Sequence, residues 1–164
     1  MAKKKNGGTP AIDVLVNTST SHEIFEYTHS RQMSDGYALD TAQILGVDPA
    51  SVFKTLLALV DGKPTVAVVP ANHRLNLKSL AKAVHGKRAE MMDPAAAERL
   101  TGYVTGGISP LGQHKRLPTV IDAHAQELPQ MIVSGGKRSI SVALNPTDLA
   151  SLTRAVFAPI IDHA

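Results

Sequence analysis

The sequence predicts an α/β fold of the α+β type, with helices packed around a mixed β-sheet. Segments with helical periodicity and segments with strand-like alternation interleave along the chain. Two turn signals, Asp61-Gly62 and Gly135-Gly136, each lie between strand-like segments and predict antiparallel hairpins. Hairpins among interleaved helices and strands make the expected sheet mixed rather than wholly parallel.

Length and composition indicate one folded domain. The chain has 164 residues, 43% of them hydrophobic, which is enough to bury a core. We expect residues 1–8, which include Lys3, Lys4 and Lys5, to be a flexible basic tail, and residues 9–164 to form a single domain. No apolar run approaches the roughly 20 residues of a membrane span. The start has no signal-type apolar segment, so a cytoplasmic location is expected.

The residue types present exclude several kinds of chemistry. The chain has no cysteine, which excludes disulfides, thiolate metal sites and a cysteine nucleophile. Its seven histidines include no pair at i, i+4 and no H-E-x-x-H pattern, so we expect no metal. No P-loop or dinucleotide fingerprint is present, and we expect no cofactor. The net charge of +3 permits a polyanionic partner without requiring one.

Capping residues mark the ends of the expected helices. N-terminal cap signals occur at Thr9, Asn76, Asp93 and Asn145. Gly46 and Gly86 are typical residues for a helix end. Helices are therefore expected at residues 10–16, 37–45, 77–84, 95–100 and 146–155. Between them, alternation and β-branched content predict strands at residues 22–28, 52–60, 65–69, 87–91, 119–122, 131–134 and 139–144.

A single charge interrupts the strongest of these strands, residues 52–60. Strand side chains alternate between faces, so Lys54 shares an apolar face with Val52, Leu56 and Ala58. An ammonium on such a face must reach water or meet an anion, because an unpaired buried charge is costly. Lys54 is therefore either a gatekeeper that protects an edge strand from aggregation or a cation at the mouth of a pocket.

The stretch 101–116 is the most unusual part of the chain. Four glycines and one proline fall within eleven positions: Gly102, Gly106, Gly107, Pro110 and Gly112. Glycine permits positive φ and close approach to the main chain, so we expect a rigid loop that presents backbone N–H groups to a ligand. The basic residues His114, Lys115 and Arg116 follow at once. The alternative is a tight surface turn with solvated charges.

Other candidate residues also have ordinary structural explanations. Tyr27 and Tyr37 are either pocket walls or half-buried core tyrosines. Lys137 and Arg138 either contact phosphates or form a solvated hairpin tip. Ser109 lacks the nucleophile-elbow pattern, which favours a turn residue.

Four motifs, in order along the chain, resemble those of the YbaK/EbsC-type aminoacyl-tRNA deacylases, relatives of the editing domain inserted in bacterial prolyl-tRNA synthetases. The similarity runs from about residue 9 to residue 158 and is greatest to the Cys-tRNA(Pro) deacylase branch. The motifs are Phe53-Lys54-Thr55-Leu56, Thr101-Gly102-Tyr103, Gly106-Gly107-Ile108-Ser109-Pro110-Leu111-Gly112 and Ser134-Gly135-Gly136-Lys137-Arg138.

The resemblance implies a compact α/β domain with a curved, mixed, largely antiparallel sheet or partial barrel and helices packed around it. It implies a pocket for the aminoacylated 3′ end of a tRNA. Lys54 matches the essential lysine of the family. Gly106, Gly107 and Ile108 match the loop that holds the aminoacyl group through its backbone, and with Lys54 they form the expected catalytic set.

The resemblance also implies a set of substrate-binding residues. Tyr27 and Tyr37 match pocket-lining positions, Tyr37 where phenylalanine is usual. Ser109 and Pro110 belong to the loop motif and are expected beside the substrate. Ser141 stands where the family often carries an aspartate, so the basis of amino-group recognition, and hence of amino-acid choice, stays open.

The expected function is trans-editing of mischarged Cys-tRNA(Pro) or Cys-tRNA(Cys). With no protein nucleophile in view, the family suggests that the substrate's own thiol attacks its ester and leaves as a thiolactone. Water is the alternative nucleophile, and it would make the enzyme an ester hydrolase rather than lyase-like. The rival functions are deacylation of another mischarged tRNA, such as Ala-tRNA(Pro), and non-catalytic binding of tRNA or a synthetase.

The expected partner is an aminoacylated tRNA. Five basic residues are expected to attract its acceptor stem weakly: His114, Lys115, Arg116, Lys137 and Arg138. Weak tRNA affinity suggests that the protein works beside prolyl-tRNA synthetase rather than alone.

Overall fold

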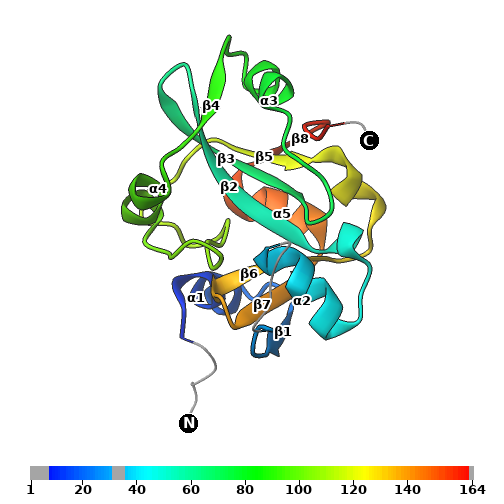
Figure 1. Cartoon of the computed structure of the whole chain (residues 1–164). Coiled ribbons are helices and arrows are strands. Elements are labelled where there is room, and N and C mark those ends of the chain that lie inside the picture. Colours follow the sequence, from blue (N-terminus) through cyan, green and yellow to red (C-terminus); the bar gives the residue numbers. More distant parts are fainter. Residues whose placement is uncertain (1–7, 31–35, 163–164) are drawn as a thin grey trace.

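A computed structural model describes residues 8–30 and 36–162 of the chain (Figure 1). Most of the expected basic tail therefore lies outside the described residues, and the single-domain assignment stays a prediction. The helices are α1 (Pro10–Asn17), α2 (Tyr37–Leu45), α3 (Leu77–Ala83), α4 (Pro94–Thr101) and α5 (Pro146–Thr153), with 3-10 turns η2 (Pro49–Ser51) and η3 (Ala123–Glu127).

The described strands form two sheets. The order β4-β2-β3-β5-β8 gives a five-stranded sheet, with β4 at Ala89–Met91, β2 at Phe53–Val60, β3 at Lys63–Pro70, β5 at Thr119–Asp122 and β8 at Val156–Ala158. The order β1-β7-β6 gives a three-stranded sheet, with β1 at Glu23–Glu26, β7 at Ile140–Leu144 and β6 at Met131–Lys137. An isolated bridge between Val52 and Ile132 joins the two sheets.

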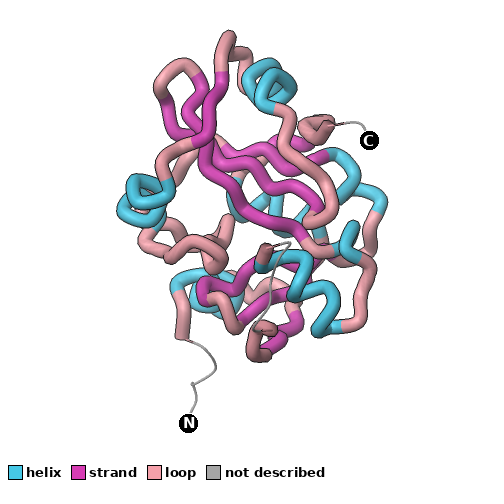
Figure 2. Tube along the Cα trace, viewed as in Figure 1, coloured by secondary structure: helices cyan, strands magenta, loops and turns pink. Residues whose placement is uncertain are grey.

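The strand pairings confirm the expected mixed, largely antiparallel α+β architecture. Strand β2 pairs antiparallel with both β3 and β4, and the whole three-stranded sheet is antiparallel. The β3–β5 and β5–β8 pairs are parallel. In the view of Figures 1 and 2, the five-stranded sheet crosses the upper half of the molecule and the three-stranded sheet lies below it, beside α1 and α2.

The helix caps and the first tight turn expected from the sequence are present in the structure. The side chains of Thr9, Asn76, Asp93 and Asn145 each accept a hydrogen bond from a backbone N–H in the first turn of α1, α3, α4 and α5. Asp61 and Gly62, with φ of 50° and 80°, form the tight turn between β2 and β3. The Thr9 hydroxyl also donates to the Gly135 carbonyl at 2.6 Å, which ties α1 to β6.

The expected turn at Gly135-Gly136 is wrong. Strand β6 continues through both glycines to Lys137, and the chain reverses after it, before Ile140. The register shifts between Ser134 and Lys137, so the two glycines form a bulge rather than a hairpin loop. Close packing explains the glycines, because a Cβ on Gly135 would lie 2.7 Å from the Ile140 side chain. Strand β8 and the turn η3 were not expected from the sequence.

The alternating faces of β2 enter different parts of the core. Phe53 and Leu57 belong to a cluster that fills the space towards α1 and the three-stranded sheet. Ala58 and Val60 belong to a second cluster, beneath α3, and Leu56 packs against it. Lys54 shares the Leu56 face by strand alternation, whereas Thr55 shares the face of Phe53. Successive residues of this strand therefore present different chemistry on its two sides.

Candidate functional site

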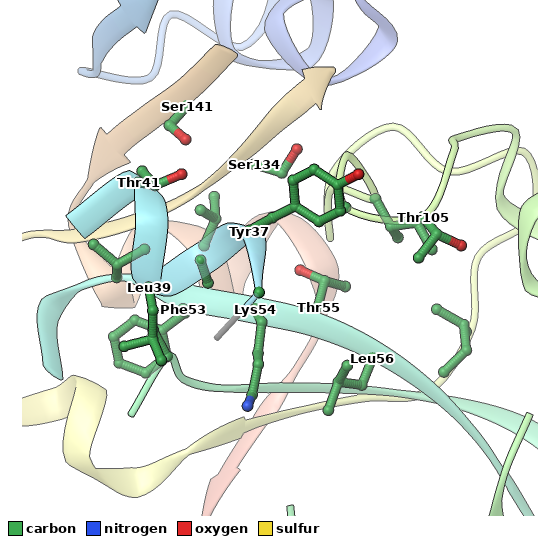
Figure 3. Close-up of a pocket in the computed structure, with 18 of the residues that line it drawn as sticks. Tyr37, Leu39, Thr41, Phe53, Lys54, Thr55, Leu56, Thr105, Ser134 and Ser141 are labelled. Atoms are coloured by element: carbon green, nitrogen blue, oxygen red, sulfur yellow. The ribbon is translucent and has the colours of Figure 1, made fainter. Parts of the chain in front are cut away.

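A pocket of about 350 Å³ lies where the two sheets, α2 and the glycine-rich loop meet (Figure 3). Its walls come from segments far apart in the sequence: β2 and the start of α4, the first turns of α2, the loop after α4, and strands β6 and β7. The lining residues that carry polar groups are Tyr27, Tyr37, Thr41, Lys54, Thr55, Thr105, Ser134, Lys137 and Ser141. The expected convergence of Lys54 and the glycine loop on one pocket is therefore present, since Gly106 and Ile108 line it too.

The pocket borders an open edge of β2. Strand β4 pairs with β2 only from Ala58 to Val60, so residues 53–56 face the pocket on that side rather than a neighbouring strand. Next to the β4 pairing, the Met92 N–H donates a hydrogen bond to the Leu57 carbonyl at 3.0 Å. Lys54 thus stands at a free strand edge, which fits a gatekeeper as well as a ligand-binding role.

Lys54 is partly buried and lacks a carboxylate partner among the described residues, whose ion pairs are His29–Asp40 and His124–Asp122. Burial lowers the pKa of the Lys54 ammonium, and repulsion from Arg74 lowers it further. Arg74 itself is exposed and does not line the pocket, so the two cations add positive charge at this end of β2. In Figure 3 the Lys54 side chain points away from Ser134 and Ser141.

Thr55 is a site residue that the sequence analysis did not single out. Its hydroxyl is a buried side-chain oxygen with no hydrogen-bond partner in the described part of the chain. It lies on the other side of β2 from the Lys54 ammonium, the side on which Tyr37 and Ser134 are found (Figure 3). A buried hydroxyl without a partner costs about 1–3 kcal/mol, so a ligand that bonds to it would remove that penalty. Its position beside Lys54 was the only signal in the sequence.

The glycine-rich loop reaches the pocket through Gly106 and Ile108, whereas the expected site residue Gly107 lies buried between them and does not line the pocket. Gly106 has φ of 86°, and a Cβ there would lie 2.5 Å from the Tyr37 ring. A Cβ on Gly107 would lie 2.9 Å from the Arg138 backbone nitrogen. The Gly107 N–H already donates to the Val104 carbonyl at 2.8 Å, so this donor of the expected cradle is occupied within the loop.

On the opposite wall, the hydroxyl of one tyrosine bonds to two other hydroxyl groups. The Tyr27 hydroxyl lies 2.6 Å from the Ser141 hydroxyl and 2.9 Å from that of Thr41. Ser141 and Thr41 are buried, and all three residues line the pocket. This wall therefore holds a neutral hydrogen-bonded cluster around Tyr27.

Tyr37 is held from several directions. Its ring packs against Gly106, and the Arg138 guanidinium lies 4.9 Å from the ring centroid. The Arg138 Nε–H donates to the Thr105 carbonyl at 2.8 Å, which connects the β6–β7 turn to the glycine loop. The ring of His29 meets both Tyr27 and Tyr37 edge-on, with centroid distances of 5.2 and 5.1 Å.

Several expected site residues lie outside this pocket. Ser109 and Pro110 are buried within the loop and do not line it, and the Ser109 hydroxyl accepts from the Leu111 N–H at 3.2 Å. The basic residues at the loop's end are exposed and flank a separate small cavity or the α4 end: His114, Lys115 and Arg116. Of the expected tRNA-binding residues, Lys137 lines the pocket and Arg138 lies beside it.

Comparison with known proteins identifies the family to which this chain belongs. A family model described as "Aminoacyl-tRNA editing domain" matches residues 37–152, which contain β2 with Lys54, the glycine loop and β6–β7. The chain belongs to the aminoacyl-tRNA editing domain family. It is also 38% identical, over 98% of both chains, to an Enterococcus faecalis protein, EbsC, named as a proposed Cys-tRNA(Pro)/Cys-tRNA(Cys) deacylase. These similarities confirm the family expected from the four motifs.

Two further relatives extend the comparison of this editing domain. The proline–tRNA ligase of Geobacter metallireducens is 30% identical over 62% of this chain, a stretch that makes up 17% of the ligase. The crystal structure of a proposed trans-editing enzyme for prolyl tRNA synthetase superposes with a TM-score of 0.80 at 22% identity, covering 98% of this chain and 100% of that one. That likeness supports the fold. Within the described residues, no helix is long and apolar enough to cross a membrane.

Proposed function

We propose that this editing domain is a trans-acting deacylase that removes cysteine from Cys-tRNA(Pro), and from Cys-tRNA(Cys) where it meets that tRNA. The main support is similarity over nearly the full length to the Enterococcus faecalis protein. The pocket supports the proposal as well, because Lys54 and Thr55 present a cation and a hydroxyl that lack ion-pair or hydrogen-bond partners among the described residues.

The proposed reaction uses the thiol of the substrate as the nucleophile. The sulfur attacks the ester carbonyl carbon, the bond to the 3′-oxygen of the terminal ribose breaks, and the thiol proton passes to that oxygen. The products are uncharged tRNA and a cyclic thiolactone. Orientation of an intramolecular nucleophile can lower a barrier by about 7–11 kcal/mol, so the protein has mainly to hold the two groups in line.

The positions of the polar groups on β2 and on the glycine-rich loop suggest a role for each in the proposed reaction. The Lys54 ammonium binds the terminal nucleotide, including its phosphate, and polarises the leaving oxygen. The Thr55 hydroxyl bonds to the aminoacyl group from the other side of the strand. The backbone N–H groups of Gly106 and Ile108, which line the pocket, stabilise the developing oxyanion, whereas that of Gly107 is engaged with Val104.

The opposite wall of the pocket is uncharged and limits the space for the substrate side chain. Tyr27 and its two hydroxyl partners, Thr41 and Ser141, form a cluster without a carboxylate, which leaves the α-amino group of the substrate without a charged partner on this wall. An uncharged wall suits a small thiol side chain. Tyr37 completes the wall against Gly106.

The proposed partners are the acceptor end of tRNA and, beside it, prolyl-tRNA synthetase, in the cytoplasm where aminoacylation takes place. Lys137 and Arg138 lie at the pocket and meet the tRNA backbone first. The more distant basic group of His114, Lys115 and Arg116 adds a weaker, salt-dependent attraction.

A panel of charged tRNAs tests this function. The purified chain is incubated with Cys-, Ser- and Ala-charged tRNA(Pro), and both the loss of charge and the released product are measured. We expect rapid release of the thiolactone from the Cys-charged tRNA and much slower loss of serine, which is isosteric but less nucleophilic. Equal rates for cysteine and serine would indicate water as the nucleophile. Preferred loss of alanine would assign the rival substrate, and binding without any deacylation would assign a non-catalytic module.

A further inference from the structure

His29 occupies a position that the proposed function does not explain. It follows β1, and its side chain is 11% exposed, between the two tyrosines of the pocket wall. Its Nδ1 lies 2.8 Å from Oδ2 of Asp40, a buried residue of α2. Its Nε2 contacts the backbone carbonyl oxygen of Arg138, in the turn between β6 and β7. One ring therefore connects three elements that form the pocket wall.

Both partners of this ring are hydrogen-bond acceptors. A backbone carbonyl can only accept, so Nε2 must carry a proton. Asp40 Oδ2 also accepts from the Ser30 N–H at 2.9 Å. Burial alone would raise the pKa of the Asp40 carboxyl, but hydrogen bonds from Ser30 and His29 outweigh it and hold that pKa below its usual value. Asp40 is thus a carboxylate, and Nδ1 must carry a proton as well.

The other groups around His29 do not supply a proton acceptor in place of these two. The rings of Tyr27 and Tyr37 make T-shaped contacts with the His29 ring, and these contacts provide no hydrogen-bond acceptor for its nitrogens. The Tyr27 hydroxyl is bonded to Thr41 and Ser141. The Arg138 guanidinium donates to Thr105 and lies over the Tyr37 ring rather than over His29. Lys137 and Arg138 share a surface hollow with His29 and add positive charge there, which Asp40 offsets.

We infer that His29 is a positioning residue of the editing pocket, and that it acts as a doubly protonated imidazolium clamped between the Asp40 carboxylate and the Arg138 carbonyl. This unit, the His29 clasp, consists of His29, Asp40 and Arg138. It holds the first turns of α2, and so Tyr37, against the β6–β7 turn. Loss of either ring proton breaks one of its two hydrogen bonds, and Tyr37 is then less firmly held. The inference rests on the proposed function for its effect on catalysis but not for its effect on structure.

The molecule contains its own control in a second histidine–aspartate pair. His124 Nδ1 also lies 2.8 Å from a buried aspartate oxygen, Oδ2 of Asp122. The His124 side chain is 60% exposed, however, and in the described part of the chain its Nε2 has no hydrogen-bond partner, while its ring stacks on that of His73. One bonded nitrogen can be satisfied by a neutral ring, so His124 has no need of a second proton.

Nitrogen NMR of the imidazole rings tests the clasp without any assay of activity. In the labelled full-length protein at neutral pH, we expect both ring nitrogens of His29 to show the shifts of protonated nitrogens. In Asp40→Asn, the amide group can donate to Nδ1, so we expect His29 to become neutral with one unprotonated nitrogen. A wild-type His29 with one unprotonated nitrogen at neutral pH would overturn the inference, whatever the enzyme does with tRNA.

Kinetics then test the positioning role. Glutamine cannot donate to both acceptors, so we expect His29→Gln to raise KM for Cys-tRNA(Pro) about tenfold, the value of one hydrogen bond to a charged group, and to change kcat little. His124→Gln should leave KM and kcat unchanged. An unchanged KM in a folded His29→Gln protein, or an equal change in His124→Gln, would overturn the role.

Discussion

The polar groups on the two sides of the pocket differ in whether they have hydrogen-bond or ion-pair partners within the protein. On the β2 side, Thr55 has no hydrogen-bond partner and Lys54 has no carboxylate among the described residues. On the opposite side, the Tyr27 hydroxyl bonds to those of Thr41 and Ser141, and behind that wall Asp40 is bonded to Ser30 and His29. Both sides are partly or wholly buried, so exposure to water does not explain the contrast.

The contrast separates groups that shape the pocket from groups that act on a ligand. A buried polar group without a partner lowers the stability of the folded chain. Groups that are fully bonded within the protein stabilise it and have little left to offer a ligand. We therefore expect changes on the β2 side to reduce activity and spare stability, and changes on the opposite side to reduce stability first.

Lys54→Ala should have the largest effect on activity. Removing a preorganised charge or donor from an active site typically lowers kcat by about 100- to 1,000-fold, so we expect a loss of that size in deacylation of Cys-tRNA(Pro). The unfolding midpoint should change little, because the ammonium has no carboxylate partner to lose among the described residues. Lys63→Ala, at an exposed position on β3, is the matched control and should deacylate normally. Near wild-type turnover by Lys54→Ala would remove the lysine from the mechanism.

Gly106→Ala should have the largest effect on stability. The residue has φ of 86°, and its new Cβ would meet the Tyr37 ring. Gly62→Ala is the control, since Gly62 has a similar φ of 80° and nothing within 4 Å of its Cβ position. Backbone strain costs about 1–3 kcal/mol at either site, and the ring contact adds to it only at Gly106. Urea denaturation that gave equal losses for the two variants would show that Tyr37 moves aside freely.

Tyr27→Phe should mainly affect stability. The change removes hydrogen bonds of 2.6 and 2.9 Å and leaves the Ser141 and Thr41 hydroxyls without their partner. Each lost bond is worth about 0.5–1.5 kcal/mol, so we expect a fall of about 1–3 kcal/mol in the free energy of unfolding. Chemical denaturation measures it. Unchanged stability would mean that water replaces the tyrosine hydroxyl and that this wall is not closed.

Thr55→Val should show the reverse pattern. Valine has nearly the same shape and removes a hydroxyl that has no partner in the described part of the chain, so the free energy of unfolding should be unchanged or slightly higher. Activity should fall about tenfold if the hydroxyl bonds to the substrate, which corresponds to roughly 1.4 kcal/mol. Full activity would leave the Thr55 hydroxyl as an unused polar group.

Arg74→Ala should shift the pH dependence of activity without abolishing it. Burial and then repulsion from Arg74 lower the pKa of Lys54, so the active ammonium is lost at a lower pH than for an ordinary lysine. Removal of Arg74 raises that pKa, and the alkaline fall in activity should move to higher pH. A pH profile of kcat/KM checks the direction. A shift to lower pH would contradict the assigned charge interaction.

Several features of the candidate pocket could be predicted from the sequence by elementary rules. Alternation along β2 made Lys54 conspicuous, because a charge on an apolar strand face has few ordinary explanations. The density of glycine identified a loop that approaches other groups closely, and Gly106 against Tyr37 is such an approach. The helix caps were readable because each depends on residues within one turn.

The remainder depends on contacts between distant segments. A threonine in a strand is unremarkable, and only the folded chain shows that the Thr55 hydroxyl lacks a partner. Arg138 lies 109 positions from His29, so no local pattern joins them. Gly135-Gly136 resembled a turn because glycine serves bulges and turns equally well, and close packing on Ile140 decided between them.

The most direct test of the account compares Thr55→Val with Tyr27→Phe in one preparation, measuring both kcat/KM for Cys-tRNA(Pro) and the free energy of unfolding. The account predicts a crossed result, in which Thr55→Val loses activity and keeps its stability while Tyr27→Phe loses stability by the larger margin. Two variants that lose the same property in the same proportion would contradict the division of the pocket into an acting side and a shaping side.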